Sequence, residues 1–456
     1  MKAIKLSLLI FLSVMGNQLK AQLWKVYNDS AKIFQQQRDN SKAVAFFQQA
    51  HTLLKKDSST TGTYFQINND IGDLYWSIGQ YANAEPFYAT GKEVIETIKG
   101  KENAEYALSC FNLGRLYRLL GQYAKAETLL IESKNIREKV LGKENADYAN
   151  SCNNLGIVYV ETGRYDEVKP LYTEAMQIRL KVLGRDHIDY AASCNNLAIL
   201  YVVTGKPYDA EPLYLEAKRI REKALGKEHP FYAASCNNLA ALYLDMGQYR
   251  KAEPLYLEAK QIRERTLGKE HPDYASSCDN LAILYMDIGN YEIAEALYKE
   301  ARLIREKSLG TKHIEYAKGC NNLALLYKLL GQFEKSADLF SAAKEIFAEA
   351  VGKDHFEYGK CCNNLGAVYM DMNDYSKATP LYIEAKQVWE KVLGKEHPEY
   401  AKACHNLALV HLKNGEYNEA EKLFLEANNI RATALGKDHP DFAEGCDNLA
   451  GVYTQK

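Results

Sequence analysis

A cysteine recurs every 42 residues along most of this chain, and this spacing constrains the fold more than any other feature. The nine cysteines in this register are Cys110, Cys152, Cys194, Cys236, Cys278, Cys320, Cys362, Cys404 and Cys446. Around each stands nearly the same sequence, Y-A-x-S-C-N-N-L-A-x-L-Y, followed by A-E-P-L-Y and I-R-E-K-x-L-G-K-E-H-P. A fixed period between about 20 and 50 residues indicates an array of supersecondary units, so the fold must be argued for the array.

One unit, Ala149 to Tyr190, contains two apolar runs with the spacing of an amphipathic helix. The first run stops at Gly163 and the second at Gly184, where glycine is a common helix terminator. Because the turns are short, the two helices must lie antiparallel. The sequence therefore predicts an all-α fold that contains one helical hairpin per unit.

Prolines occur at two fixed places in the unit. Pro170 is expected in the first turn of the second helix, where the missing N–H is least harmful. In later units a His-Pro pair lies between the hairpins, and its proline is expected to begin the next helix. The equivalents of Pro170 are Pro212, Pro254 and Pro380, and the His-Pro prolines are Pro230, Pro272, Pro398 and Pro440.

These residues resemble the tetratricopeptide repeat, and most closely its 42-residue variety in kinesin light chain. The signature positions fall on Leu155, Gly156, Tyr159, Val168, Tyr172 and Ala175, where the family usually has alanine in place of Val168. The tail from Ile220 to Ala233 resembles the kinesin light chain linker. The resemblance implies a right-handed α-solenoid, a superhelix of antiparallel helical hairpins.

The array suggests four segments. Residues 65–442 are predicted to form nine 42-residue repeats, and residues 22–64 a degenerate helical pair that precedes them. Residues 443–456 are expected to form an incomplete final helix, which suggests a fragment of a longer protein. Residues 1–21 have a positive start, an apolar core and a small-residue site near Ala21, which is the pattern of a signal peptide. We therefore expect export to the periplasm or beyond.

Charge narrows the choice of partners. Removal of the signal peptide would leave 54 basic and 59 acidic residues, a net charge of −5. No basic stripe is present, so we expect no nucleic-acid partner. No later segment is apolar enough for a membrane span, so we expect no membrane insertion of the mature chain. The sequence leaves the oligomeric state open.

Comparison of the repeats with one another separates shared positions from variable ones. With Ala149 as position 1, positions 2, 5, 9, 12 and 13 face the concave groove in tetratricopeptide folds, as the resemblance implies. Positions 9 and 12 are mainly apolar in the middle repeats, and position 13 carries several carboxylates. The apolar candidates are Ile199, Val202, Leu244, Ile283, Met286 and Met370, and the acidic ones are Asp245, Asp287 and Asp371. A peptide with apolar and some basic side chains would suit this surface.

Asparagine dominates positions 5 and 6. The position 5 candidates for groove contact are Asn153, Asn195, Asn237, Asp279, Asn321 and Asn363. An amide offers a donor and an acceptor to a peptide group, and in peptide-binding relatives such an asparagine clamps the ligand. Position 6 is asparagine from Asn112 to Asn448, which also fits a brace between neighbouring helices.

No catalytic constellation is expected. Equivalent residues on neighbouring helices lie about 8–10 Å apart, too far for a disulfide between successive cysteines, so the cysteines are predicted to be core residues. A bridge between Cys361 and Cys362 is the remaining alternative. One histidine per inter-repeat turn, from His187 to His439, predicts a cap or loop role rather than a shared metal site. We expect no catalytic residue, no metal and no cofactor.

Three functions are compatible with these observations. The first is a non-enzymatic scaffold that binds peptide or protein segments in the groove. The second is the recognition or regulatory arm of a larger protein, whose effector, a CHAT protease-like domain or a signalling kinase, would follow Lys456. The third is a structural spacer.

Overall fold

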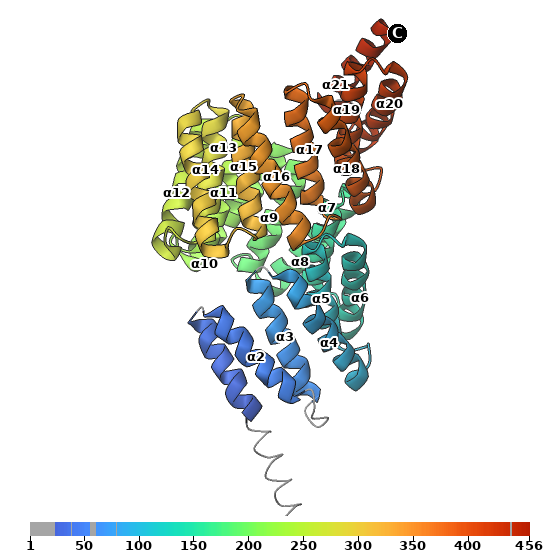
Figure 1. The fold of residues 1–456 in the computed structure, drawn as a ribbon. Helices are drawn as coiled ribbons and strands as arrows, with labels where there is room; N and C mark the ends of the chain where they lie inside the picture. The colour runs from blue at the N-terminus through green and yellow to red at the C-terminus, as the bar shows by residue number, and fades with distance from the viewer. Residues whose placement is uncertain (1–22, 38, 55–60, 79, 438–439) are drawn as a thin grey trace, which may run out of the picture. The chain divides into compact units, whose positions relative to one another are not determined.

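The computed structural model describes residues 23–37, 39–54, 61–78, 80–437 and 440–456. The predicted signal peptide lies outside these residues. In the described part every regular element is an α-helix (Figure 1). No described helix combines the length and the apolar character that a membrane crossing requires. The chain divides into two compact units, residues 1–143 and 144–456.

The first unit contains a helix at residues 23–36 and five further helices. These are α2 (Asn40–Leu54), α3 (Thr61–Ser77), α4 (Tyr81–Lys99), α5 (Ala104–Leu119) and α6 (Tyr123–Leu141). The helix at 23–36 and α2 occupy the segment 22–64, for which a degenerate helical pair was predicted.

The second unit contains α7 to α21. These are α7 (Ala146–Glu161), α8 (Tyr165–Leu183), α9 (Ile188–Val203), α10 (Pro207–Leu225), α11 (Pro230–Asp245), α12 (Tyr249–Leu267), α13 (Pro272–Asp287), α14 (Tyr291–Leu309), α15 (Ile314–Leu329), α16 (Phe333–Ala350), α17 (Phe356–Asp371), α18 (Tyr375–Leu393), α19 (Pro398–Lys413), α20 (Tyr417–Ala434) and α21 (Pro440–Gln455).

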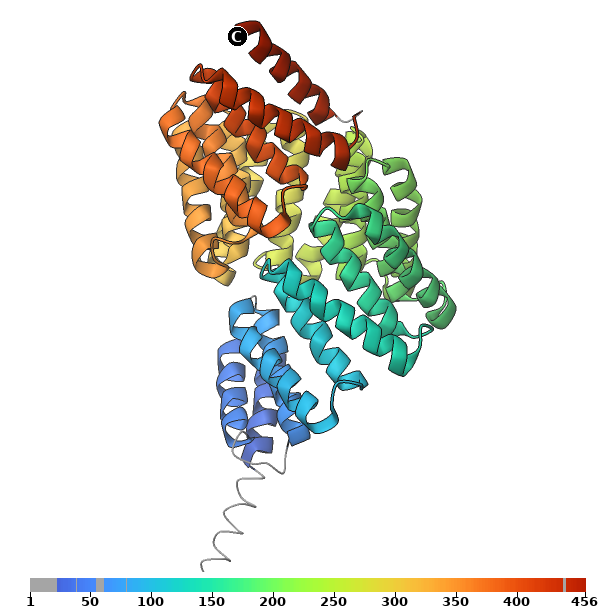
Figure 2. The same ribbon diagram turned by 90° about the vertical axis from the view of Figure 1, so that its right-hand side faces the viewer.

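Within the second unit the helices form hairpins that stack in chain order (Figure 2). Each odd-numbered helix packs against the helix that follows it, and from α11 to α19 successive odd-numbered helices also touch. The predicted all-α fold of antiparallel hairpins is therefore confirmed. The last helix, α21, has 16 residues, the same length as α7 and α19, and begins three residues before the start predicted at 443.

The inter-repeat histidines cap the odd-numbered helices. In His187 the ring Nδ1 accepts a hydrogen bond from the backbone N–H of Asp189 at 3.1 Å. His229, His271, His313, His355 and His397 make the same contact at α11, α13, α15, α17 and α19. Because the first N–H groups of a helix have no helical acceptor, these rings satisfy one of them. The predicted cap role is confirmed for these six histidines, and His439 lies outside the described residues. Pro230, Pro272, Pro398 and Pro440 begin helices as expected.

The prediction for Pro170 was wrong. Helix α8 begins at Tyr165, so Pro170 lies in its second turn and the helix continues to Leu183. The equivalent residues Pro212, Pro254 and Pro380 also lie inside α10, α12 and α18. The error arose because the apolar pattern, from which the helix start was judged, begins later than the helix itself. Each proline removes one helical N–H without ending the helix.

The turn inside each hairpin needs a left-handed residue. After α7, Gly163 has a φ of +72°, and the N–H of Arg164 donates to the carbonyl of Tyr159 at 2.8 Å. This bond closes a Schellman motif, for which glycine is the preferred residue. In the turn after α17 the position is taken by Asn373, at a φ of +57°, and asparagine tolerates this conformation better than most residues.

Eight of the nine repeated cysteines lie in the core, as predicted, and the ninth, Cys446, is exposed. All are free thiols. The pKa of Cys236 is raised to about 12, mainly by burial. Near this thiol, the hydroxyl of Tyr232 donates to Glu258 at 3.0 Å, and the same pairing recurs in most repeats. The cysteines are stacking positions rather than reactive groups, because a buried thiol with a raised pKa is a poor nucleophile.

Candidate interaction surface

The asparagines of positions 5 and 6 form hydrogen bonds between neighbouring repeats of the second unit. The position 6 amide of one repeat donates to the position 5 amide oxygen of the repeat before it, at 2.7–3.2 Å. We call this series the asparagine ladder; it joins Asn196 to Asn153, Asn238 to Asn195, Asn280 to Asn237, Asn364 to Asn321, and Asn406 to Asn363. Position 6 therefore braces the array, one of the two roles that the sequence left open.

The ladder limits what position 5 can offer a ligand. Asn153, Asn195, Asn321 and Asn363 are buried, and Asn237 is half-buried. Each of these five amide oxygens already accepts a hydrogen bond from the next repeat. The part of each amide that remains for a ligand is its NH₂ group.

Asp279 is the exception at position 5. Its carboxylate lies 2.6 Å from the guanidinium of Arg305 on α14, and both side chains are almost fully buried. Burial raises the pKa of Asp279 to about 6, against the opposing effect of Arg305. A buried ion pair of this kind contributes little to stability by itself, because both charges have lost their water.

The apolar candidates of positions 9 and 12 form a row of half-buried side chains along the odd-numbered helices. Ile199 and Val202 belong to α9, Leu244 to α11, and Ile283 and Met286 to α13; all pack at the edge of one apolar core cluster. Met370 on α17 packs against a different cluster. We call these six residues the apolar row. Five of the six therefore pack against the same cluster, and Met370 does not.

The carboxylates of position 13 lie at helix C-termini. Asp245, Asp287 and Asp371 are the last residues of α11, α13 and α17 and are exposed. A negative charge is unfavourable at this end of a helix, because the helix dipole is also negative there. Asp371 is 3.0 Å from Lys328, but Asp245 and Asp287 have no ion-pair partner among the described residues. Burial and then the charge of Asp287 raise the pKa of Asp245.

A second set of polar contacts holds successive hairpins together. The guanidinium of Arg221 on α10 donates to the hydroxyl of Ser235 on α11 at 2.8 Å. Arg179 with Ser193, and Arg263 with Ser277, make the same contact at 2.7 Å. We call these three pairs the arginine–serine bridges. These bridges were not predicted from the sequence, although an arginine and a serine recur with the period of the array and so give a usable signal.

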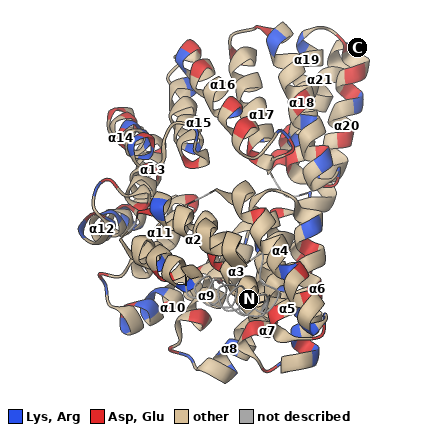
Figure 3. Ribbon diagram, turned by 60° about the horizontal axis from the view of Figure 1, so that its bottom comes forward, with Lys and Arg blue, Asp and Glu red and all other residues tan. Residues whose placement is uncertain are grey.

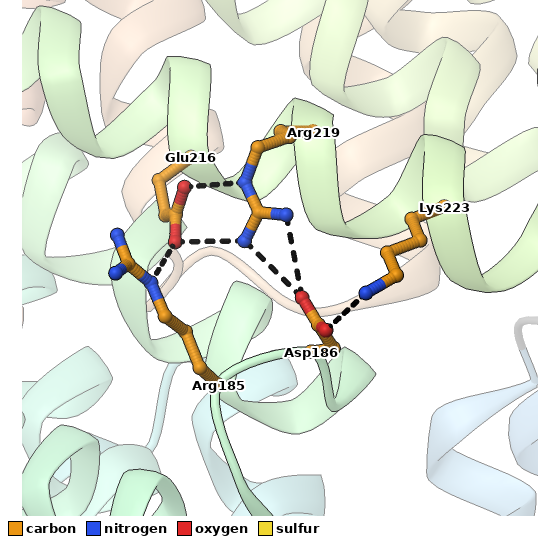
Figure 4. A network of polar contacts seen from close by, with 5 residues as sticks. All are labelled: Arg185, Asp186, Glu216, Arg219 and Lys223. Atoms are coloured by element: carbon orange, nitrogen blue, oxygen red, sulfur yellow. Dashed lines mark hydrogen bonds and ion pairs between the residues drawn. The ribbon is translucent and has the colours of Figure 1, made fainter.

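The outer edge of the second unit carries a five-residue ion network (Figure 4). Glu216 lies 2.7 Å from Arg219 and 2.8 Å from Arg185, and Asp186 joins Arg219 and Lys223. The pKa of Glu216 falls to about 2, mainly because of Arg219. The network fastens the turn before α9 to helix α10. Exposed pairs of this kind contribute little individually, so we assign it a supporting role.

Elsewhere charges of both signs are mixed along the helices (Figure 3). No group of three or more His, Cys, Asp or Glu side chains in the described ranges is arranged to hold a metal ion.

Comparison with known proteins identifies the repeat. A family model for the tetratricopeptide repeat matches in eight overlapping stretches: 63–139, 111–181, 147–223, 189–265, 233–302, 279–349, 317–379 and 361–433. A search of curated proteins gave no match.

Among solved structures, a putative kinesin light chain of Podosopora anserina with nearly identical TPR-like repeats is 28% identical, with a TM-score of 0.40. The alignment covers 45% of this chain and 97% of that one. BtubC (BKLC) from P. vanneervenii is 27% identical, with a TM-score of 0.44, over 52% of this chain and 94% of that one. Because the family model covers most of the sequence, the chain belongs to the tetratricopeptide repeat family.

Proposed function

We propose that the protein is a non-enzymatic scaffold that binds peptide segments along the odd-numbered helices of its second unit. The observation that supports this proposal is the pair Asp245 and Asp287. Both carboxylates are placed where the helix dipole disfavours them, and neither has an ion-pair partner in the described part of the chain. A cation from a bound partner would relieve both conditions.

The apolar row defines the rest of the ligand. Leu244 precedes Asp245, and Met286 precedes Asp287, so each carboxylate stands beside a half-buried apolar side chain. A peptide that alternates apolar and basic side chains would bury the first kind against the row and pair the second kind with the carboxylates. Methionine in the row suits this role because its flexible side chain adapts to different partners.

The proposal is tested with a library of peptides in which leucine or isoleucine alternates with lysine or arginine, compared with the same library carrying glutamate. Fluorescence anisotropy with the whole chain should detect binding of the basic peptides, and binding should weaken as salt is added. The double variant Asp245→Asn, Asp287→Asn should bind about 2- to 30-fold more weakly, since each exposed ion pair is worth about 0.2–1 kcal/mol.

Asp371→Asn is the matched control. It removes a carboxylate at the same repeat position, but one that Lys328 already neutralises, so the loss of affinity should be smaller. If the two variants lose equal affinity, or if no peptide in the basic library binds, the proposed surface is wrong and the role of a structural spacer gains support.

A further inference from the structure

A polar cavity of about 230 Å³ lies among α13, α14, α15 and α17 of the second unit. Its lining includes Asp279, Arg305, Lys318 and Lys360, together with Glu315 and Asn321. Unlike the apolar row, this cavity is lined mainly by charged and amide groups. Its charged side chains are of both signs.

The inner end of the cavity holds a buried acceptor that lacks a donor. One carboxylate oxygen of Asp279, Oδ2, contacts Arg305, but Oδ1 has no hydrogen-bond partner. The nearby Asn322 amide lowers the pKa of this carboxylate, yet it lies outside hydrogen-bonding geometry to Oδ1. A buried polar atom in this condition costs free energy unless something else satisfies it.

A change in sequence explains this arrangement. In the three preceding repeats the equivalent arginine bonds to a serine of the next helix, but here that serine is replaced by Gly319. Arg305 faces Gly319 where those arginines face a serine; its guanidinium lies 2.6 Å from Asp279 and also donates to the hydroxyl of Ser276 on α13 at 3.3 Å. Gly319 does not leave room for a large side chain, because a Cβ there would lie 3.3 Å from the guanidinium.

The outer end of the cavity offers cationic donors. Lys318 is 2.7 Å from Glu315, whereas Lys360 is 3.8 Å from Glu357, which is beyond hydrogen-bond distance. Both lysine side chains are more than 40% exposed, so they can turn toward a ligand at little cost.

We propose that this cavity binds a free α-amino acid, with the ammonium group at Asp279 Oδ1 and the carboxylate at Lys360 and Lys318. A zwitterion fits because the cavity presents an unsatisfied acceptor at one end and donors at the other, while its own charges balance. An amine alone would leave Lys318 and Lys360 paired only with Glu315 and Glu357, and a carboxylate alone would leave Asp279 Oδ1 unsatisfied. The volume is sufficient for an amino acid with a small or medium side chain.

The test screens the 20 standard L-amino acids one at a time against the whole chain, by isothermal titration calorimetry at millimolar concentration. The strongest binder is then compared with its α-amide, which lacks the carboxylate, and with its N-acetyl derivative, which lacks the ammonium group. Each derivative should bind at least 10-fold more weakly than the free amino acid. If no amino acid binds, or if either derivative binds as well as the parent, the proposal is overturned.

Variants locate the site. Lys360→Met should weaken binding at least 10-fold, whereas Lys402→Met, at the same repeat position one repeat later and outside the cavity lining, should leave it unchanged. Asp279→Asn should also abolish binding, although it leaves Arg305 buried without its anion. The Lys360 side chain is partly exposed and makes no close ion pair, so Lys360→Met serves as the variant that does not threaten the fold. Equal losses in Lys360→Met and Lys402→Met would place the binding elsewhere.

Discussion

The early and late junctions of the second unit use different side chains to hold the same backbone arrangement. From α8 to α13, a buried or half-buried arginine of each even-numbered helix bonds to a serine of the next odd-numbered helix. Further along, the serine positions hold Gly319, Cys361 and Ala403, and the arginine positions hold Arg305, Phe347 and Trp389. The two positions have changed together.

The junctions α16–α17 and α18–α19 replace the polar bridge with aromatic packing, whereas the same position on α20 holds Arg431. Phe347 and Trp389 are buried, and the indole N–H of Trp389 donates to the carbonyl of Phe356 at 3.2 Å. The ring requires a glycine beside it, because a Cβ on Gly359 would lie 2.8 Å from the indole nitrogen. Position 1 is alanine in most other repeats, so Gly359 and Trp389 form a matched pair.

Stacking of the repeats therefore needs a filled interface between hairpins, but either a polar bridge or a buried aromatic ring can fill it. Between the two types of junction, the arginine position still holds Arg305, but the serine position holds Gly319. The polar cavity lies at this junction. The site proposed for an amino acid thus coincides with the transition between the two solutions. Three measurements test whether the two types of junction differ in this way.

The largest effect is expected at a late junction. Trp389→Ala removes a fully buried aromatic side chain and should lower the free energy of unfolding by about 3–5 kcal/mol. Chemical denaturation followed by circular dichroism measures the loss. Gly359→Ala should also destabilise the wild-type chain, but it should be nearly neutral in the Trp389→Ala background. Additive losses in the double variant would contradict the matched pair.

Acid should open the late repeats before the early ones. Burial lowers the pKa of His405 to about 4, with a smaller contribution from Arg431, and burial alone lowers the pKa of His397 to about 4. Since an unfolded histidine titrates near 6.5, the unfolded chain takes up protons first as pH falls. The stabilisation is complete above pH 6.5 and is lost as pH falls toward 4, by up to about 3 kcal/mol for His405.

Hydrogen exchange measured at pH 7 and pH 4.5, corrected for intrinsic rates, should show α19 to α21 losing protection first. His405→Asn should remove most of the pH dependence that His405 contributes in this region. Uniform loss of protection along the unit would show that the late junctions are not the acid-sensitive ones.

The smallest effect is expected at an early junction. Ser235→Ala removes the 2.8 Å acceptor of the half-buried Arg221 guanidinium, which keeps a longer 3.4 Å contact with the carbonyl of Phe231, and should cost about 1–3 kcal/mol. Ser193→Ala and Ser277→Ala should cost similar amounts, because both bridges have the same geometry. Ala403→Ser, at the late position that faces no arginine, should give no gain in stability. A loss below about 0.5 kcal/mol for Ser235→Ala would mean that packing dominates at both kinds of junction.

Much of the fold could be predicted because the repeats of this one sequence can be aligned with one another. The hairpins, the buried cysteines and the capping histidines each recur once per repeat, and a residue required for stacking must recur in that way. The starts of the even-numbered helices were placed too late. Their first turns carry few apolar residues, so the hydrophobic pattern does not mark them.

The candidate surface was less accessible from sequence. The resemblance to tetratricopeptide folds predicted that position 5 faces the groove. Asn195 could contact either a ligand or the amide of Asn238. The choice depends on the angle between two helices, which the sequence of a single repeat does not determine. The Asp279–Arg305 pair likewise joins residues of two helices and follows from the loss of a serine at Gly319. The sequence does contain a sign of this pair: Asp279 and Gly319 both depart from the residues that the preceding repeats have at these positions.

The asparagine ladder also bears on how the gene can change. Each hydrogen bond of the ladder joins the side-chain amides of two adjacent repeats, at a separation of 43 residues. A tandem duplication of a 42-residue unit that has asparagine at both positions would therefore add one hydrogen bond and preserve all the others. An insertion that shifted one helix relative to its neighbours would leave an amide facing the wrong partner. The length of the array is free to vary during evolution, but only in whole repeats.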